Sequence, residues 1–242
     1  MTSKETRPPL VRSCLHVTCH SSLVTIPNVA KKPKTPAVRG SIIVISAPSG
    51  AGKSTLIRRL RANTPGLAFS VSYTTRAPRP GEKHGRDYYF VSPEVFKRMV
   101  SRNEFAEWAE VHEHFYGTER KQLQAAQKAG RDILLDIDVQ GHQQVRQRLP
   151  EAVSVFILPP SFHELSRRLH DRHSEKREDI EARLQKAREE ITHWTEYDYL
   201  VVNDNLQDAT QALRAIVRAA RFRRPSQAGR VEEIIAKFGG KR

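Results

Sequence analysis

Short, largely apolar runs recur along the chain and predict strands that are buried on both faces. They cover residues 42–45, 133–137, 153–158 and 199–202, and most are rich in β-branched residues. Strands of this kind are typical of a parallel sheet whose two faces are both covered by helices. No stretch of 18 uncharged apolar residues occurs, so the sequence predicts no membrane span.

Helical signals alternate with these runs. The first predicted helix, residues 53–63, carries its apolar residues on one side, and Ser92-Pro93 is typical of the start of a second helix that ends near Arg102. Further helices are predicted to begin after Ser161, where a capping box lies, to cover residues 179–194, and to follow the last strand. Strands that alternate with helices need crossover connections, so the pattern predicts an α/β fold around a parallel sheet.

Residues 1–40 lack any such pattern. They are rich in Ser, Thr and Pro, and they hold seven basic residues and one acidic residue, which accounts for +6 of the net charge of +14. We interpret them as a disordered extension, although a basic, hydroxyl-rich segment is also typical of an organellar transit peptide. Cys14, His16, Cys19 and His20 are too crowded for tetrahedral metal ligation, so we interpret them as a chance cluster. Because the chain has only these two cysteines, we expect a cytoplasmic protein without a disulfide framework.

The remaining charge of +8 favours anionic partners in general, nucleotides included. Few aromatic residues interleave with the basic residues at 223–242, so we interpret this segment as a solvated tail rather than a nucleic-acid-binding surface.

The strongest chemical signal follows the first predicted strand. Residues 47–54 have the sequence Ala-Pro-Ser-Gly-Ala-Gly-Lys-Ser between a strand and a helix, which is the context of a phosphate-binding loop. Gly50 and Gly52 allow backbone N–H groups to converge on phosphate oxygens, and the helix N-terminus adds a favourable dipole. Lys53 would reach the outer phosphates, and Ser54 would offer its hydroxyl to Mg²⁺. Ala47 departs from the usual pattern, which begins with glycine.

Carboxylates for such a metal ion are expected at the end of a neighbouring strand. Asp136 and Asp138 lie at the end of the apolar run 133–137, and alternation would direct both side chains to the same side of the strand. Acidic residues at this place often only cap a helix. Beside a phosphate-binding loop they favour metal or substrate binding.

A second cluster of polar residues indicates a site for another phosphate group. Arg76 and Arg79 lie three residues apart, beside hydroxyl residues, in a segment bounded by Pro and Gly, and a tyrosine-rich segment at 87–90 follows closely. Guanidinium groups and tyrosine hydroxyls together suit a phosphate dianion.

With these motifs, residues 41 to about 222 resemble the guanylate kinase family, whose members use ATP to phosphorylate GMP. The resemblance rests on an ordered set of segments: residues 47–55, 72–79, 85–88, 104–108, 116–118, 136–141 and 202–204. It implies a parallel-sheet phosphate-loop kinase core, a GMP-binding insert with a mixed sheet at about 72–120, and a mobile lid at about 168–185. Residues 1–40 and 223–242 would be a basic extension and a basic tail.

The resemblance also implies a set of site residues. The ATP-binding residues would be Ala47, Pro48, Ser49, Gly50, Ala51, Gly52, Lys53, Ser54 and Thr55. The GMP-binding residues would be Ser72, Arg76, Arg79, Tyr88, Glu107, Tyr116, Thr118 and Asp138. The cofactor would be Mg²⁺, held by Ser54 and Asp136, and the catalytic residues would be Lys53, Arg168, Arg172 and Arg183. The lid departs from the family pattern around His173, where a small residue is usual.

These implied roles agree with the chemistry of the substrates. Guanine presents two N–H donors and one carbonyl acceptor on one edge, so a carboxylate such as Glu107 could accept both donors while a hydroxyl donates to the carbonyl. Adenine would leave the carboxylate unpaired, and sites of this kind discriminate by roughly 10⁴ or more. The attacking oxygen belongs to an anionic phosphate, so no general base is needed, and catalysis becomes alignment and neutralisation of charge.

Three other functions are compatible with parts of this pattern. A kinase acting on a ribose bisphosphate would share the phosphate-binding loop but would have less use for Ser72 and Glu107. A non-catalytic, peptide-binding relative would be expected to lack Gly50, Gly52 and Lys53, which this chain retains. A basic nucleic-acid-binding protein would show salt-sensitive affinity without turnover. The sequence predicts no particular oligomeric state.

Overall fold

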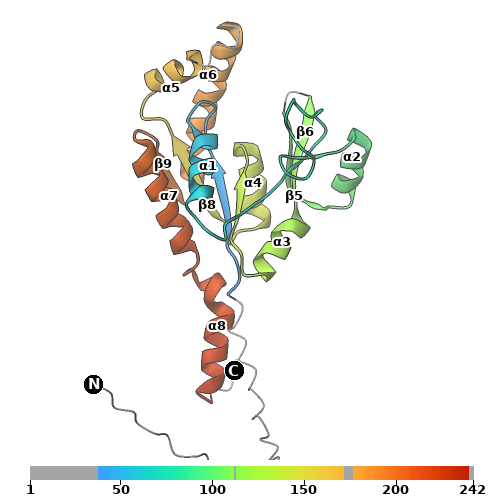
Figure 1. Ribbon diagram of the computed structural model, residues 1–242, viewed down its shortest axis with the longest axis vertical. Helices are drawn as coiled ribbons and strands as arrows, with labels where there is room; N and C mark the ends of the chain where they lie inside the picture. The colour runs from blue at the N-terminus through green and yellow to red at the C-terminus, as the bar shows by residue number, and fades with distance from the viewer. Residues whose placement is uncertain (1–37, 112, 172–176, 240–242) are drawn as a thin grey trace, which may run out of the picture. The chain divides into compact units, whose positions relative to one another are not determined.

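The computed structural model describes residues 38–111, 113–171 and 177–239, and it shows the predicted alternation of strands and helices (Figure 1). Within these residues a five-stranded sheet has the order β2-β7-β1-β8-β9, and every neighbouring pair is parallel. Its strands are β2 (Ala68–Phe69), β7 (Ile133–Asp136), β1 (Ile42–Ser46), β8 (Val153–Leu158) and β9 (Tyr199–Val202). The predicted α/β fold with a parallel sheet is therefore confirmed.

Helices connect the strands and cover the sheet. They are α1 (Lys53–Ala62), α2 (Pro93–Ser101), α3 (Arg120–Lys128), α4 (Val139–Arg148), α5 (Phe162–His170), α6 (Arg177–Ile191), α7 (Leu206–Ala220) and α8 (Arg224–Lys237), with a 3₁₀ turn, η1 (Thr192–Glu196), after α6. Ser92 and Ser161 cap α2 and α5 as predicted, because each hydroxyl oxygen accepts a hydrogen bond from the backbone N–H three residues further on. Among the residues that the structure describes, no helix has the length and apolar character needed to cross a bilayer.

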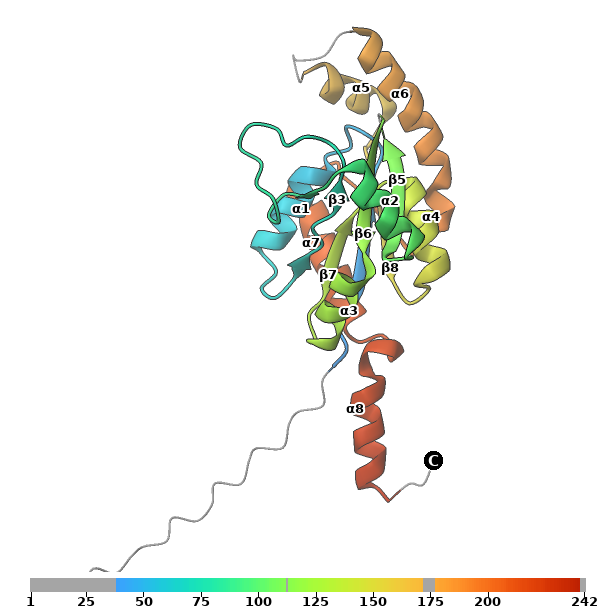
Figure 2. The ribbon, with the colours of Figure 1, turned by 90° about the vertical axis from the view of Figure 1, so that its right-hand side faces the viewer.

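Strand β1 shows why these runs are largely apolar. Ile43 and Ile45 point to the face on which α1 and α7 pack. Ile42 and Val44 point to the opposite face, which is covered by α3 and α4 (Figure 2). Since helices lie on both faces, none of these four side chains is more than 1% exposed, and a strand in this position needs apolar residues at every position.

A second, mixed sheet forms the insert that the family resemblance implies. Within the described residues its strands have the order β4 (Tyr89–Phe90), β3 (Tyr73–Thr74), β6 (His114–Glu119) and β5 (Phe105–Val111). β3 pairs in parallel with β4 and antiparallel with β6, which also pairs antiparallel with β5. Stacked rings fasten α2 to this sheet, since the centroid of Phe96 lies 4.5 Å from that of Phe105 and 5.5 Å from that of Phe115.

Within the segment predicted as a basic tail, residues 224–237 form α8. This helix carries a stripe of apolar residues, Val231, Ile234 and Ile235, each about half exposed.

One buried carboxylate joins three elements at the edge of the parallel sheet where β1 and β7 begin. Asp132 is 2% exposed. Its Oδ1 accepts a hydrogen bond from the backbone N–H of Ser41 at 2.9 Å, and its Oδ2 accepts one from Nε of Arg221. Ser41 precedes β1, Asp132 precedes β7 and Arg221 follows α7, so one side chain holds the starts of two neighbouring strands against the end of a helix.

We expect Asp132→Ala to lower the free energy of unfolding by about 2–4 kcal/mol, because a buried N–H loses its acceptor and Arg221 loses its partner. Asp171→Ala is the matched control. Asp171 also pairs with an arginine, Arg167 at 2.8 Å, but both side chains are more than half exposed, so a loss of about 1 kcal/mol or less is expected. Urea unfolding monitored by circular dichroism measures both variants. Equal losses would contradict the role assigned to Asp132.

Candidate active site

The loop between β1 and α1 has the backbone conformation of a phosphate-binding loop. Gly50 and Gly52 have φ angles of 91° and 92°, a left-handed conformation that residues with a Cβ rarely adopt. Space is also short at Gly52, where a Cβ would lie 2.4 Å from Nδ2 of Asn203. Helix α1 begins directly afterwards at Lys53, so the loop and the helix N-terminus can present N–H groups to the same anion.

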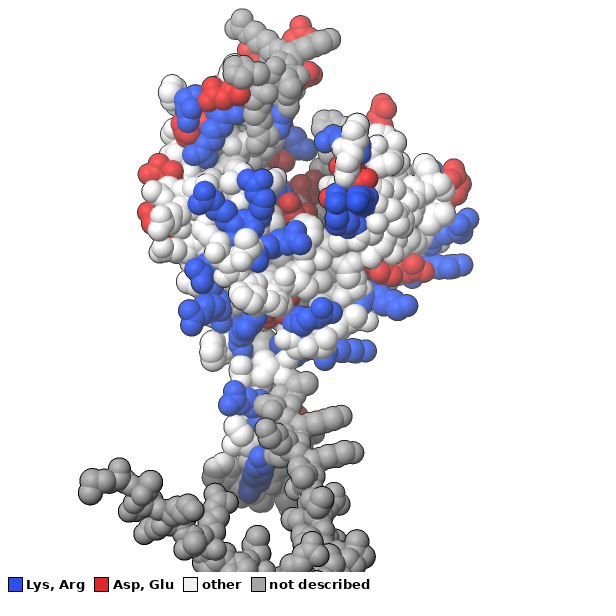
Figure 3. All heavy atoms as spheres, viewed as in Figure 1, with Lys and Arg blue, Asp and Glu red and all other residues white. Residues whose placement is uncertain are grey.

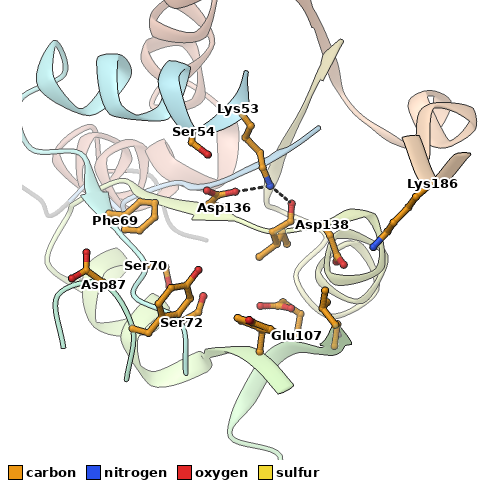
Figure 4. A pocket seen from close by; sticks show the side chains of 15 residues that line it. Lys53, Ser54, Phe69, Ser70, Ser72, Asp87, Glu107, Asp136, Asp138 and Lys186 are labelled. Atoms are coloured by element: carbon orange, nitrogen blue, oxygen red, sulfur yellow. Dashed lines mark hydrogen bonds and ion pairs between the residues drawn. The ribbon is translucent and has the colours of Figure 1, made fainter. Parts of the chain in front are cut away.

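Lys53 extends from the start of α1 toward the end of β7 (Figure 4). Its Nζ lies 2.6 Å from Oδ1 of Asp136 and donates a hydrogen bond to the backbone carbonyl of Ile137 at 3.2 Å. Ser54 lines the same cavity. A serine hydroxyl beside a carboxylate is an oxygen ligand set that suits a hard cation such as Mg²⁺.

A cavity of about 400 Å³ lies between the end of the parallel sheet and the mixed sheet. Figure 3 shows acidic side chains recessed in a hollow, with basic side chains around its rim. The predicted site residues that line the cavity are Lys53, Ser54, Ser72, Tyr88, Glu107, Tyr116, Asp136 and Asp138. The fold therefore brings together residues that were predicted from separate motifs.

Glu107 is the deeply buried acid of this cavity, with 4% of its surface exposed. Burial, reinforced by the nearby Asp138 carboxylate, raises the pKa of Glu107 to about 7. Thr118 lies opposite Glu107 on β6 and is completely buried. Hydrogen bonding from Thr118 opposes the rise in the pKa of Glu107. A buried carboxylate with a hydroxyl beside it is suited to a polar ligand that offers both donors and an acceptor.

Asp138 has two roles in the structure. It is the N-cap of α4, where its Oδ1 accepts a hydrogen bond from the backbone N–H of Gly141 at 2.8 Å. It also lines both the main cavity and the hollow beside the phosphate-binding loop. Asp138 therefore caps a helix, as acids at strand ends often do, and also lines the candidate site.

Arg76 and Arg79 lie outside the residues that line the cavity. The guanidinium of Arg76 contacts both carboxylate oxygens of Glu82, at 2.9 and 3.0 Å, and it lies 5.5 Å from the ring centre of Tyr88, which does line the cavity. This pairing holds the pKa of Glu82 below its usual range. Arg79 donates its backbone N–H to Glu82 at 2.7 Å. In this conformation Glu82 therefore occupies the anion position in front of Arg76.

Of the predicted lid arginines, Arg183 contacts the phosphate-binding loop and Arg168 lies close to it, 4.0 Å from where a Cβ of Gly52 would be. Nη2 of Arg168 on α5 donates to the backbone carbonyl of Asn203 at 3.1 Å, and Arg168 is also paired with Glu164. Arg183 on α6 donates from Nε and Nη2 to Oγ of Ser49, at 3.0 and 2.7 Å. Arg172 and His173 lie outside the described residues.

Sequence reasoning assigned no role to three polar residues near the site, although Asn203 belongs to one of the segments that carry the resemblance. Lys186 lines the cavity, Glu190 accepts a hydrogen bond from the Ser49 N–H at 3.4 Å, and Asn203 donates from Nδ2 to the Ala51 carbonyl at 2.8 Å. Burial raises the pKa of Glu190. Residues 183, 186 and 190 share one face of α6, so the helical spacing from Arg183 could have indicated the other two.

Comparisons with known proteins agree with this geometry. A family model described as guanylate kinase matches residues 39–220. A guanylate kinase of Dechloromonas aromatica (strain RCB) is 51% identical over 181 residues, which are 75% of this chain and 90% of that protein. The chain belongs to the guanylate kinase family. A guanylate kinase of Escherichia coli (strain K12) is 48% identical over 202 residues, which are 83% of this chain and 98% of that protein.

The guanylate kinase fold is matched by a solved structure as well. A crystal structure of guanylate kinase from Anaplasma phagocytophilum has a TM-score of 0.67 and 37% sequence identity, and the match covers 86% of this chain and 100% of that one. The resemblance found in the sequence is therefore confirmed.

The raised pKa of Glu107 predicts a pH-dependent stability. Its folded pKa of about 7 lies above the unfolded value of 4.5, so between these values the folded state holds a proton that the unfolded state has lost. The contribution of Glu107 to stability therefore falls as the pH rises from about 4.5 to about 7, and it stays constant above that. Relative to Glu107→Gln, which cannot titrate, the unmodified protein should lose about 3 kcal/mol of unfolding free energy over this interval. Urea unfolding of both proteins over a pH series measures the difference, and a difference that is independent of pH would contradict the assignment.

Proposed function

We propose that this chain transfers the γ-phosphoryl group of ATP to GMP, and to dGMP, giving ADP and the guanosine diphosphate. The observation that carries the proposal is the position of Glu107, a buried carboxylate in the same cavity as the lysine of the phosphate-binding loop. The relatives from Dechloromonas and Escherichia bear the name guanylate kinase, which supports the same activity.

The guanine base would lie at the end of the cavity that holds Glu107. The ionised carboxylate would accept hydrogen bonds from N1 and the 2-amino group, and Asp138 would lie beside it. The hydroxyls of Ser72 and Thr118 would donate hydrogen bonds to O6. A base without the 2-amino group or with a donor at position 6 leaves buried polar atoms unpaired, and this lowers the binding free energy substantially.

The GMP phosphate would be held by Arg76, Arg79, Tyr88 and Tyr116. Arg76 already binds a planar anion, since its Nη2 donates to both carboxylate oxygens of Glu82. A phosphate carries more charge than a carboxylate, so it can replace Glu82 in front of this guanidinium. Arg76 would then move from a pairing within its loop to one with the substrate.

Catalysis would rest on alignment and charge neutralisation. The loop 47–52 and Lys53 would hold the ATP phosphates, while Arg168, Arg172 and Arg183 of the lid would neutralise charge on the transferred group. The phosphate of GMP is itself the nucleophile and needs no general base. Closure of the lid would exclude water and so prevent hydrolysis of ATP.

Mg²⁺ is the metal ion that the donor set favours. Ser54 and Asp136 would hold it, and when bound it would neutralise the outer phosphates of ATP. Asp136 now pairs with Lys53 at 2.6 Å, so the same carboxylate orients the lysine beside the metal position.

ADP release from ATP and Mg²⁺ tests the proposal, with GMP, dGMP, AMP, UMP or no acceptor. We expect turnover with GMP and dGMP, with a preference over AMP of about 10⁴ or more. If ATP binds but no acceptor causes ADP release, the proposal is overturned, and a ribose-phosphate kinase or a non-catalytic module is favoured.

Two variants test the two ends of the cavity separately. Lys53→Ala should lower transfer by at least about 10²–10³-fold, because a donor to the transferred phosphoryl group is lost. Glu107→Ala should remove base selectivity and leave ATP binding intact. Lys97→Ala, an exposed lysine on α2, is the control and should behave as the unmodified enzyme. Steady-state kinetics with GMP and AMP measure all three, and unchanged GMP turnover in either site variant would contradict the scheme.

A further inference from the structure

The outer edge of β5 is closed by side chains of α4 instead of another strand. β5 is the last strand in the order of the mixed sheet, so half of its backbone groups face away from β6. The side-chain amide of Gln144 pairs with this edge as the peptide group of a neighbouring strand would. Its Nε2 donates to the carbonyl of Trp108 at 2.6 Å, and its Oε1 accepts from the N–H of Trp108 at 3.3 Å. This two-point contact fixes both the position and the direction of the strand.

A second side chain of α4 holds the other flank of Glu107. Nη1 of Arg148 donates to the carbonyl of Ala106 at 3.0 Å. Gln144 and Arg148 are four residues apart and share one face of the helix, just as Ala106 and Trp108 share the outer edge of β5. Glu107 lies between these two anchored residues.

Glu107 also follows an irregularity in the strand. The pairing with β6 steps from Phe105–Glu119 to Glu107–Thr118, so Ala106 is an extra residue in a β-bulge. Bulges redirect the side chains next to them, and their extra residue has no ladder partner. Arg148 supplies a donor for the carbonyl of that residue, so α4 stabilises the local bend that aims Glu107 into the cavity.

Helix α4 also packs against the carboxylate of Glu107 itself. A Cβ at Gly141 would lie 2.8 Å from Oε2 of Glu107, so the first turn of α4 approaches the carboxylate as closely as a glycine permits. Residues 141, 144 and 148 thus surround one residue of β5. The contacts are made to the backbone on both sides of Glu107 and to its carboxylate end.

We propose that Gln144, together with Arg148, is a positioning residue that sets base selectivity by holding the β5 bulge so that Glu107 faces the guanine edge. This inference rests on the proposed function. A carboxylate accepts two N–H groups of one base edge only when it lies near the plane of the base, and hydrogen bonds weaken steeply with misalignment. An edge strand held only by β6 would be free to tilt, and one of the two bonds would be lost.

The test compares Gln144→Met with Gln147→Met. Methionine keeps the length of the side chain and removes both hydrogen bonds, and Gln147 is an exposed glutamine of the same helix. In Gln144→Met we expect the KM for GMP to rise about tenfold, equivalent to about 1.4 kcal/mol, with the KM for ATP unchanged. The preference for GMP over IMP, which lacks the 2-amino group, should fall by a similar factor. Arg148→Met should likewise raise the KM for GMP and leave the KM for ATP unchanged. Gln147→Met should match the unmodified enzyme.

The possible outcomes are distinguishable. If the unmodified chain does not phosphorylate GMP, the proposed function fails, and this inference fails with it. If the unmodified chain is active and Gln144→Met has the same KM for GMP and the same GMP-to-IMP preference as Gln147→Met, only the positioning role fails. A parallel rise of both KM values, or a large fall in the thermal midpoint without a change in base preference, would show that Gln144 has a merely structural role and would also overturn the inference.

Discussion

Burial of an ionisable carboxylate inside a phosphate-binding cavity is the constraint on which the rest of the structure depends. In the proposed function Glu107 accepts hydrogen bonds from guanine only when it is ionised, yet burial raises its pKa to about 7. The fold therefore keeps the carboxylate at the end of the cavity formed by the mixed sheet, while the phosphate-binding loop lies at the end of the parallel sheet. The two sheets thus hold Glu107 and Lys53 at different ends of one cavity (Figure 4).

A single continuous segment connects the two ends. Asp136 at the end of β7 pairs with Lys53, and Asp138 caps α4. Gly141 lies against the carboxylate of Glu107, and Gln144 then holds the backbone beside it. Within nine residues, from Asp136 to Gln144, the chain passes from the partner of Lys53 to the backbone beside Glu107. In the proposed function, this short segment would fix the relative position of the two substrates.

The parts that were predictable from sequence are those determined by local chemistry. Residues 42–45 of strand β1 are all apolar because helices cover both of its faces, and the loop at Gly50 and Gly52 needs conformations that few residues adopt. Helices α3 and α4 were not predicted, because their exposed faces are polar and only a few residues of each, such as Leu123 and Val145, are buried in the core. Their role in holding the cavity appears only when distant segments are brought together.

The site residues show the same division. Lys53 and Asp136 were predicted from short motifs, and Glu107 from the family resemblance, and all three line one cavity. The partnership of Arg76 with Glu82 depends on the conformation of a loop, and the approach of Glu190 to Ser49 depends on how α6 packs over the phosphate-binding loop. The helical spacing from Arg183 could have indicated Glu190 but not its partner, and nothing periodic indicated the pairing of Arg76 with Glu82, so tertiary structure was needed to find both contacts.

Three cations of the site are paired with acceptors of the protein itself. Lys53 contacts Asp136, Arg76 contacts Glu82, and Arg183 donates to Ser49. These pairings limit the repulsion among basic groups that gather around one cavity, and they hold long side chains near their working positions before a substrate arrives. A phosphate group offers more charge and more acceptor oxygens than a carboxylate or a hydroxyl, so binding can exchange these partners at low net cost. The internal acceptors thus make the site stable when empty and still leave the stronger interaction for the nucleotide.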